Sequence, residues 1–202
     1  MQHQQHRAKK NRASDSDASE PAPPQAFADQ VTADSIIMGS GEHSVRGDTT
    51  ALVCYDRFTK FLYAFPDKSH NVEAIVTAMQ KYFGKEKPKL IYTDSAPELS
   101  RAMQELQFPH DTSTPHRPQS NGVSERAVRK VKEGTKCILK QSGLMALWWN
   151  YAMECYCFLH NVVEEIVAQG DLLQTPYQLG WELATRKYST IRMRSTVQIF
   201  QS

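Results

Sequence analysis

The sequence predicts a mixed α/β fold, with a sheet of about five strands covered by helices. Short runs rich in Val, Ile, Leu, Tyr and Phe, separated by turn residues, are typical of strands in the first half of the chain. Later segments repeat apolar residues every three to four positions, as amphipathic helices do. The chain has 202 residues, 40% of them hydrophobic, which is enough for one substantial core. We therefore expect one domain with tails.

The two ends of the chain differ in composition from its middle. Residues 1–26 are rich in polar residues and bury too little apolar surface to order themselves, which predicts a disordered tail without a secretory signal. Residues 27–180 carry the strand and helix patterns of the expected domain. Residues 181–202 are predicted to form a basic C-terminal tail that diverges in composition from the rest of the chain. The longest apolar region, 144–169, is interrupted by acids, so it is predicted as a buried helix and not as a membrane span.

Charge and cysteine content limit the classes of protein to which this chain can belong. The 24 basic and 22 acidic residues nearly balance, so any case for nucleic-acid binding must come from local clusters. The cysteines, Cys54, Cys137, Cys155 and Cys157, contain no Cys-x-x-Cys pair. This pattern predicts free thiols in a reducing compartment.

The elements of the first half are strands followed by a helix. Strands are expected over residues 33–38, 49–55 and 58–65. Asp56 and Arg57 would form the hairpin turn between the second and third strands. Asn71 is a suitable N-cap and Gly84 a suitable C-terminal stop for the helix that follows. Its apolar stripe consists of Val72, Ile75, Val76, Met79 and Phe83.

The second half adds two strands and three helices. Short strands are expected over residues 89–93 and 110–114. Helices are expected over residues 97–106, 123–141 and within 144–169. The polar, turn-rich segment 115–122 is predicted to be a loop before the long helix.

Three acids stand in settings that indicate a shared site. Asp34 lies in the first predicted strand, Asp94 directly follows a later strand, and Glu125 lies in the first predicted turn of the long helix. If the strand of Asp34 is central and adjoins the strand that ends at Asp94, the three carboxylates meet at one edge of the sheet. Such a cluster requires cations or raised pKa values. Asp29 and Asp48 are alternatives to Asp34, but Asp29 precedes the strand and Asp48 follows a Gly-rich turn.

The long helix carries a charged stripe and an apolar stripe. At about 100° per residue, one side collects Glu125, Arg129, Lys132 and Lys136, which we name the Glu125 stripe. The opposite, apolar side consists of Val123, Ala127, Val131 and Ile138. The Glu125 stripe is either an ordinary solvated helix face or a row of contacts to DNA phosphates.

Two motifs carry a resemblance to a known family. The segment Asp-Ser-Ala-Pro-Glu-Leu from Asp94 resembles Asp-Asn-Gly-x-Glu-Phe, and Pro-Gln-Ser-Asn-Gly-Val-Ser-Glu-Arg over residues 118–126 resembles Pro-Gln-x-Asn-Gly-x-x-Glu-Arg. Both motifs belong to the catalytic core of retroviral and retrotransposon integrases. The segments at residues 55–60 and 175–177, the latter similar to copia-type elements, extend the resemblance over roughly residues 27–180.

The resemblance implies a ribonuclease H-like fold and a DDE-type transferase that trims DNA ends and joins them to target DNA with two Mg²⁺ or Mn²⁺ ions. Asp34, Asp94 and Glu125 would be the catalytic acids and the metal ligands. The resemblance implies DNA as the partner, no membrane association, and a possible homo-oligomer. It also implies action in the nucleus, although residues 9–12 are only a weak import signal. The residues expected to touch DNA are His116, Arg117, Gln119, Asn121, Arg126, Arg129, Lys132 and Lys136.

Some features depart from the family pattern. Ser95 and Ala96 replace the usual Asn and Gly, the interval from Asp94 to Glu125 is short, and the amino-terminal His and Cys zinc module has no counterpart. Two alternatives therefore stay open: an inactive DNA-binding remnant, or a nuclease of the same fold that cuts without joining. Asp56 and Glu98 are expected to be structural acids paired with cations. Trp148, Trp149, Tyr151, Phe158 and Leu159 are expected to form core or a dimer face.

Overall fold

The computed structural model describes residues 22–112, 118–167 and 173–180. Among them, a five-stranded sheet has the order β3-β2-β1-β4-β5. Its strands are β1 (Val31–Ile37), β2 (Thr50–Asp56), β3 (Leu62–Asp67), β4 (Ile91–Thr93) and β5 (His110–Thr112). The first three strands are antiparallel neighbours, whereas β4 and β5 run parallel to β1. The predicted mixed sheet is confirmed, and β1 is its central strand.

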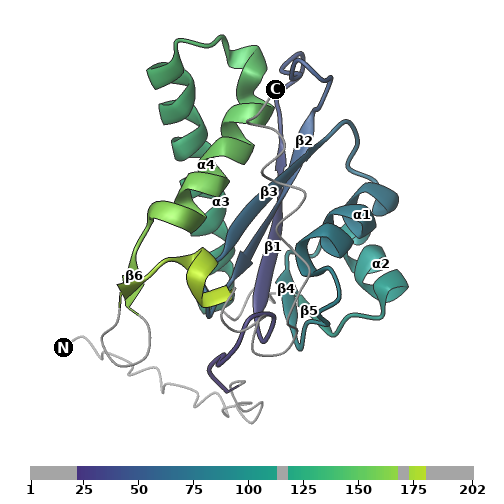
Figure 1. Ribbon diagram of the computed structural model, residues 1–202. Coiled ribbons are helices and arrows are strands. Elements are labelled where there is room, and N and C mark those ends of the chain that lie inside the picture. The colour runs from purple at the N-terminus through teal and green to yellow at the C-terminus, as the bar shows by residue number, and fades with distance from the viewer. Residues whose placement is uncertain (1–21, 113–117, 168–172, 181–202) are drawn as a thin grey trace, which may run out of the picture.

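Helices cover both faces of this sheet (Figure 1). The helices α1 (Val72–Phe83) and α2 (Pro97–Leu106) lie on one face, and α3 (Pro118–Ser142) and α4 (Trp149–Val163) lie on the other. A short 3₁₀ turn, η1 (Ala146–Trp148), precedes α4, and β6 (Ile166–Val167) pairs with β7 (Leu173–Gln174). None of the helices in the described ranges combines the length and apolar character needed to cross a membrane.

Alternation along β1 decides which face each side chain occupies. Val31 and Ala33 belong to the core beneath α1 and α2, whereas Ile36 belongs to the core beneath α3 and α4. Since successive strand residues point to opposite faces, Asp34 lies on the α3 side with Ile36. The sheet thereby turns the first predicted acid toward the helix that carries Glu125.

The helix α1 ends where its capping residues predict. The side chain of Asn71 accepts a hydrogen bond from the N–H of Ala74 at 2.9 Å. Gly84, with a φ of 58°, donates its N–H to the carbonyl of Gln80 at 2.8 Å. A positive φ is most easily adopted by glycine, which explains why the helix stops there.

The turn between β2 and β3 is longer than predicted, because β3 begins at Leu62 and not at residue 58. Asp56, which is fully buried, organises this turn. Its Oδ1 accepts hydrogen bonds from the N–H groups of Phe58 and Thr59 and from the Thr59 hydroxyl, at 3.1, 2.7 and 2.8 Å. Its Oδ2 accepts the N–H of Ala28 at 2.8 Å. Asp56 is thus structural, as predicted, but it is satisfied by these donors and not by a paired cation.

Replacing Asp56 by Ala is expected to lower the free energy of unfolding by about 3 kcal/mol, because four donors lose a buried acceptor. Urea unfolding followed by circular dichroism would measure the change. Asp67→Ala is the matched control, since Asp67 accepts the N–H of Ser69 at the surface and its loss should cost less than about 1 kcal/mol. Equal losses in the two variants would contradict the role given to Asp56.

The helix α3 begins at Pro118, so the predicted loop 115–122 is wrong over its second part. Proline is favoured at the first position of a helix, because its φ is already helical and its missing N–H would have no partner there. The Asn-Gly dipeptide that predicted a turn lies inside this helix instead. Glu125 consequently lies about two turns into α3, and not in its first turn.

Candidate functional site

Asp34 anchors the candidate site on the central strand. Its side chain is half-buried and lies on the α3 side of β1. The N–H of Ser35 donates to its Oδ1 at 2.7 Å, which holds the carboxylate close to its own backbone. A carboxylate on the middle strand of a packed sheet has a well-defined position.

Asp94 lies beside Asp34 at the carboxyl end of the neighbouring strand. Val31 pairs with Ile91 across the parallel strands β1 and β4, and the same offset brings Asp34 level with Asp94. Asp94 is exposed, and its Oδ1 accepts the N–H of Ala96 at 3.1 Å. This hydrogen bond closes the turn after the acid, although the usual Asn-Gly pair is absent.

Glu125 approaches from the helix layer. The helix α3 packs on β1 and β2, the side of the sheet that Asp34 faces. All four members of the Glu125 stripe are exposed, so the stripe points away from the core. Glu125 therefore lies on the exposed side of a helix that packs on the strand of Asp34.

The pKa of Asp34 depends on the charges of the two other acids. Burial raises the pKa of Asp34, and the charges of Asp94 and Glu125 raise it further. The Ser35 N–H and the Lys132 charge oppose this shift without reversing it. Carboxylates from a central strand, a strand end and a helix thus lie within electrostatic reach of Asp34.

These acids suit a divalent cation chemically but do not yet form a closed set of ligands. Within the parts of the chain that the structure describes, no three His, Cys, Asp or Glu residues are gathered closely enough to hold a metal ion. Carboxylate oxygens are nevertheless ligands that Mg²⁺ prefers, and a cation would relieve the repulsion that raises the pKa of Asp34. Asp94 and Glu125 are exposed, so a cation can reach both from solvent.

The two alternatives to Asp34 have structural partners. Asp29 forms an ion pair with Lys89 at 2.7 Å; burial alone would raise the pKa of Asp29, but Lys89 and nearby backbone N–H groups lower it overall. Asp48 is buried and accepts hydrogen bonds from the Ser44 hydroxyl and the Asn150 amide, at 2.7 and 2.8 Å. Neither acid has the surroundings of Asp34.

The residues expected to touch DNA separate into two groups. Residues without a described side chain are His116, Arg117, Gln119 and Asn121; the first two lie outside the described ranges, and the last two lie in α3. Exposed residues along α3 are Arg126, Arg129, Lys132 and Lys136. The charge of Lys132 lowers the pKa of Asp34 against the effect of burial, so this member of the basic row lies within electrostatic reach of that acid.

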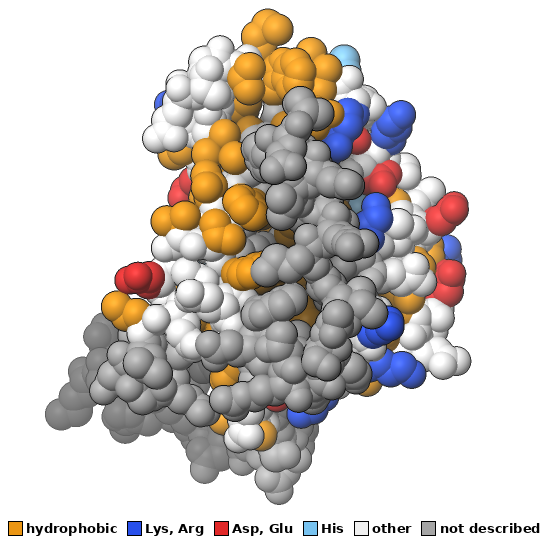
Figure 2. Space-filling view, viewed as in Figure 1, with side chains coloured by type: hydrophobic (Ala, Val, Ile, Leu, Met, Phe, Trp, Pro, Cys, Tyr) orange, Lys and Arg blue, Asp and Glu red, His pale blue; other side chains and the backbone are white. Residues whose placement is uncertain are grey.

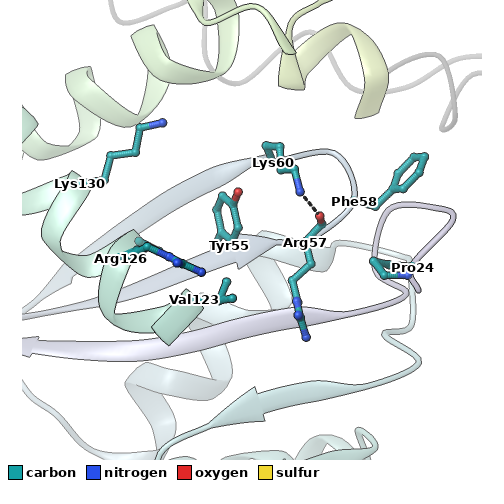
Figure 3. A pocket seen from close by; sticks show the side chains of 9 residues that line it. Pro24, Tyr55, Arg57, Phe58, Lys60, Val123, Arg126 and Lys130 are labelled. Carbon is teal, nitrogen blue, oxygen red and sulfur yellow. Dashed lines mark hydrogen bonds between the residues drawn. The ribbon is translucent and has the colours of Figure 1, made fainter. Parts of the chain in front are cut away.

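A basic hollow of about 660 Å³ lies between α3 and the turn that follows β2 (Figure 3). Its cations are Arg57, Lys60, Arg126 and Lys130. Of these four cations, only Arg126 was predicted to contact DNA. The missed signals were Arg57 in the predicted hairpin turn, Lys60 within the predicted strand 58–65, and Lys130 one helical turn beyond Arg126.

Many of the exposed hydrophobic side chains of the described residues lie on or next to α4. Figure 2 shows them over the α4 side, whereas charged side chains are scattered over the α1 and α2 side. Tyr151, Phe158 and Leu159 are 42%, 41% and 38% exposed, while Trp149 is buried. The aromatic segment therefore divides between a core residue and a surface face.

The fold is similar to that of retroviral integrase catalytic cores. The catalytic core domain of BIV integrase superposes with a TM-score of 0.56 and 17% identity, covering 80% of this chain and 99% of that chain. A structure of the simian T-cell lymphotropic virus intasome in complex with PP2A regulatory subunit B56 gamma superposes with a TM-score of 0.59 and 17% identity, covering 84% of this chain and 57% of that chain.

In sequence, the chain is similar to retrovirus-related Pol polyproteins. Those of transposons RE1 and RE2 from Arabidopsis thaliana are 26% and 25% identical over 134 residues, or 63% of this chain. The Pro-Pol polyprotein of feline foamy virus is 26% identical over 138 residues, or 66% of this chain. The matches span only 9% of each transposon polyprotein and 11% of the viral one. No protein-family model matches the chain.

Proposed function

We propose that this chain is the catalytic core of a retrotransposon-type integrase, which processes DNA ends and joins them to target DNA. The observation that carries this proposal is the approach of Asp94 and Glu125 to Asp34 at one edge of an integrase-type sheet. The similarity to Pol polyproteins supports DNA as the substrate class.

Asp34, Asp94 and Glu125 would hold two Mg²⁺ or Mn²⁺ ions. Such ions, when bound, activate the attacking oxygen and neutralise charge on the leaving oxygen of a phosphoryl transfer. The carboxylates bind and orient and need not transfer protons. Asp34 supplies the rigid part of the site from the central strand, while Asp94 and Glu125 complete it from the exposed rim.

The Glu125 stripe supplies the path for DNA toward the acids. Arg129, Lys132 and Lys136 continue from Glu125 along one side of α3, and all three are exposed. Cations in such a row neutralise successive phosphates. The exposed apolar face of α4 suits a homo-oligomer, and a solved relative of this fold is an intasome.

Arg129→Ala is expected to weaken duplex DNA binding and to reduce the slope of log affinity against log salt by about 0.9, the value for one lost phosphate contact. Fluorescence anisotropy over a salt series would measure both quantities. Arg101→Ala is the control, because Arg101 is exposed on α2 at the other face of the sheet. An unchanged slope in the Arg129 variant would count against a phosphate contact.

The reaction itself separates the proposal from its two alternatives. The protein would be incubated with labelled donor DNA ends, target DNA and Mn²⁺, and the products separated by size. Joined products support the integrase. Nicked DNA without joining indicates a nuclease, and DNA binding without any product indicates an inactive remnant; either result overturns the proposal.

A further inference from the structure

The basic hollow gathers positive charge around one space. Arg57 and Lys60 border it from the turn after β2, and Arg126 and Lys130 border it from α3, while none of the described residues that line it is acidic (Figure 3). Burial lowers the pKa of Lys60, and the charge of Arg57 lowers it further, although Asp56 acts in the opposite direction. Cations so grouped repel one another, and an anion in the hollow would relieve that repulsion.

The hollow and the acids occupy different sides of α3. At about 100° per residue, Val123, Arg126 and Lys130 form a stripe roughly 125° around the helix from the Glu125 stripe. The buried residues Ala127 and Val131 face the sheet. A cation in the hollow is therefore not part of the row that leads to Asp34.

The helix α4 holds the turn that carries Lys60. The side chain of Asn161 accepts the N–H of Leu62 at 2.9 Å and donates to its carbonyl at 2.7 Å. The ring Nε2 of His160 lies 3.0 Å from the carbonyl oxygen of Lys60. His160 and Asn161 are both buried. The helix α4 thus holds the turn that carries Lys60 in place without a ligand, and a site preorganised in this way loses less entropy on binding.

The acids near the hollow already have partners. Glu164 accepts hydrogen bonds from Lys130 at 2.6 Å and contacts His160, so it positions Lys130 and neutralises part of its charge. Asp56 is buried beneath the turn among its own donors. Positive charge from Lys60 and Arg126 remains available to a ligand.

Tyr55 adds a neutral donor to the same space. Figure 3 shows its ring between Lys60 on one side and Arg126 and Lys130 on the other. Burial raises the pKa of Tyr55 to about 12, and Glu164 and Asp56 contribute to that shift. The hydroxyl therefore keeps its proton at neutral pH and can donate a hydrogen bond to an anion.

We propose that this hollow is a second phosphate site, which holds a backbone phosphate of bound DNA away from the three acids. Lys60, Arg126 and Lys130 would neutralise the phosphate, and Tyr55 would donate a hydrogen bond to it. Phosphate oxygens accept several charge-assisted hydrogen bonds at once, and the volume also admits part of the attached nucleotide. This inference rests on the proposed function, because DNA supplies the phosphate; free polyphosphate has the same chemistry and is a separate arm of the test.

The test compares the double variant Lys60→Gln, Lys130→Gln with the wild-type chain in binding to labelled single-stranded DNA over a salt series. Loss of the one phosphate held in the hollow should reduce the salt slope by about 0.7. The matched control is Lys81→Gln, Lys85→Gln, which removes two exposed cations at the end of α1 and should leave the slope unchanged. If the double variant does not fold, Lys60→Gln alone is expected to reduce the slope by a smaller amount, because Arg126 and Lys130 still face the phosphate.

Further readouts separate this site from the acids. The rise in melting temperature on adding Mn²⁺ reports the acids, so it should persist in the double variant. Tyr55→Phe should weaken DNA binding with the salt slope unchanged, because it removes a neutral donor.

A salt slope equal to wild type in the double variant overturns the second phosphate site and leaves the integrase proposal intact. If sodium tripolyphosphate stabilises the wild type but not the double variant, while the DNA slope is unaltered, the assignment to DNA is overturned.

Discussion

Glu125→Gln is expected to reduce DNA joining about a thousandfold while the melting temperature changes by no more than a few degrees. The amide preserves the size of the side chain but removes the charge that would help to hold a divalent ion. Such an ion supplies several kcal/mol to phosphoryl transfer, and each 1.4 kcal/mol is about tenfold in rate. Glu125 is exposed on α3, so its replacement leaves the core intact. Single-turnover assays with labelled donor ends and Mn²⁺ would measure the loss.

Glu133→Gln is the matched control for this experiment. Glu133 is exposed on the same helix and lies outside the Glu125 stripe, so the variant should join DNA at the wild-type rate. Equal activity in the Glu125 variant and the wild type would refute the role of Glu125. A similar loss in both variants would mean that the overall charge of α3, and not a ligand, controls the reaction.

Local sequence predicted the elements well where local chemistry defines their ends. Asn71 and Gly84 cap α1 as expected, and α2 spans Pro97–Leu106 as predicted. The errors arose where one signal competed with another. The Asn-Gly dipeptide suggested a turn, but Pro118 starts a helix that continues through it. The side chain of Asp56 lengthened the turn before β3 through contacts that the hydrophobic pattern does not reveal.

Motifs indicated Asp94 and Glu125, and a predicted strand indicated Asp34, but the approach of these acids to one another could be predicted only conditionally. It depends on β1 being the central strand and pairing with β4, a long-range arrangement that no local pattern determines. The basic hollow depends even more on tertiary structure. Its walls come from the turn after β2 and from α3, and α4 fixes the turn through His160 and Asn161, about a hundred positions away.

Two sides of the helix α3 face two different groups of charged residues. One side brings Glu125 and Lys132 to the half-buried Asp34, and another borders the basic hollow with Arg126 and Lys130. If both sides bind phosphates, a DNA strand is held at two points that a single rigid helix keeps in register. Substituting the three acids should then abolish DNA joining while DNA binding is retained. Substituting the cations of the basic hollow should weaken DNA binding before it affects the joining step.

Asp34→Asn is expected to abolish joining and, without metal, to raise the melting temperature at neutral pH by roughly 2–4 °C, or about 1 kcal/mol for a chain of this size. Burial and the charges of Asp94 and Glu125 raise the pKa of Asp34 in the folded state. An acid whose folded pKa is raised destabilises the fold when it ionises, so the variant gains stability at neutral pH. The gain is modest because the carboxylate is half-buried and water screens part of the repulsion.

Melting curves from pH 3 to pH 8 would test the sign of this effect. The difference between variant and wild type should vanish below about pH 4, where Asp34 is protonated in both folded and unfolded chains, and should grow as the pH rises through the raised pKa. Asp29→Asn is the control of opposite sign, since Lys89 and backbone donors lower the pKa of Asp29 despite its burial, and its loss should destabilise the fold at neutral pH.

Adding Mn²⁺ should reverse the ranking of the two proteins. An ion at a hundred times its dissociation constant stabilises the folded wild type by about 2.7 kcal/mol, which exceeds the gain expected from removing the charge. The Asp34 variant should lack most of this response, because its amide cannot neutralise the ion. A variant that responds to Mn²⁺ as strongly as the wild type would mean that the ion binds elsewhere, and the three acids would then be a source of repulsion without a catalytic purpose.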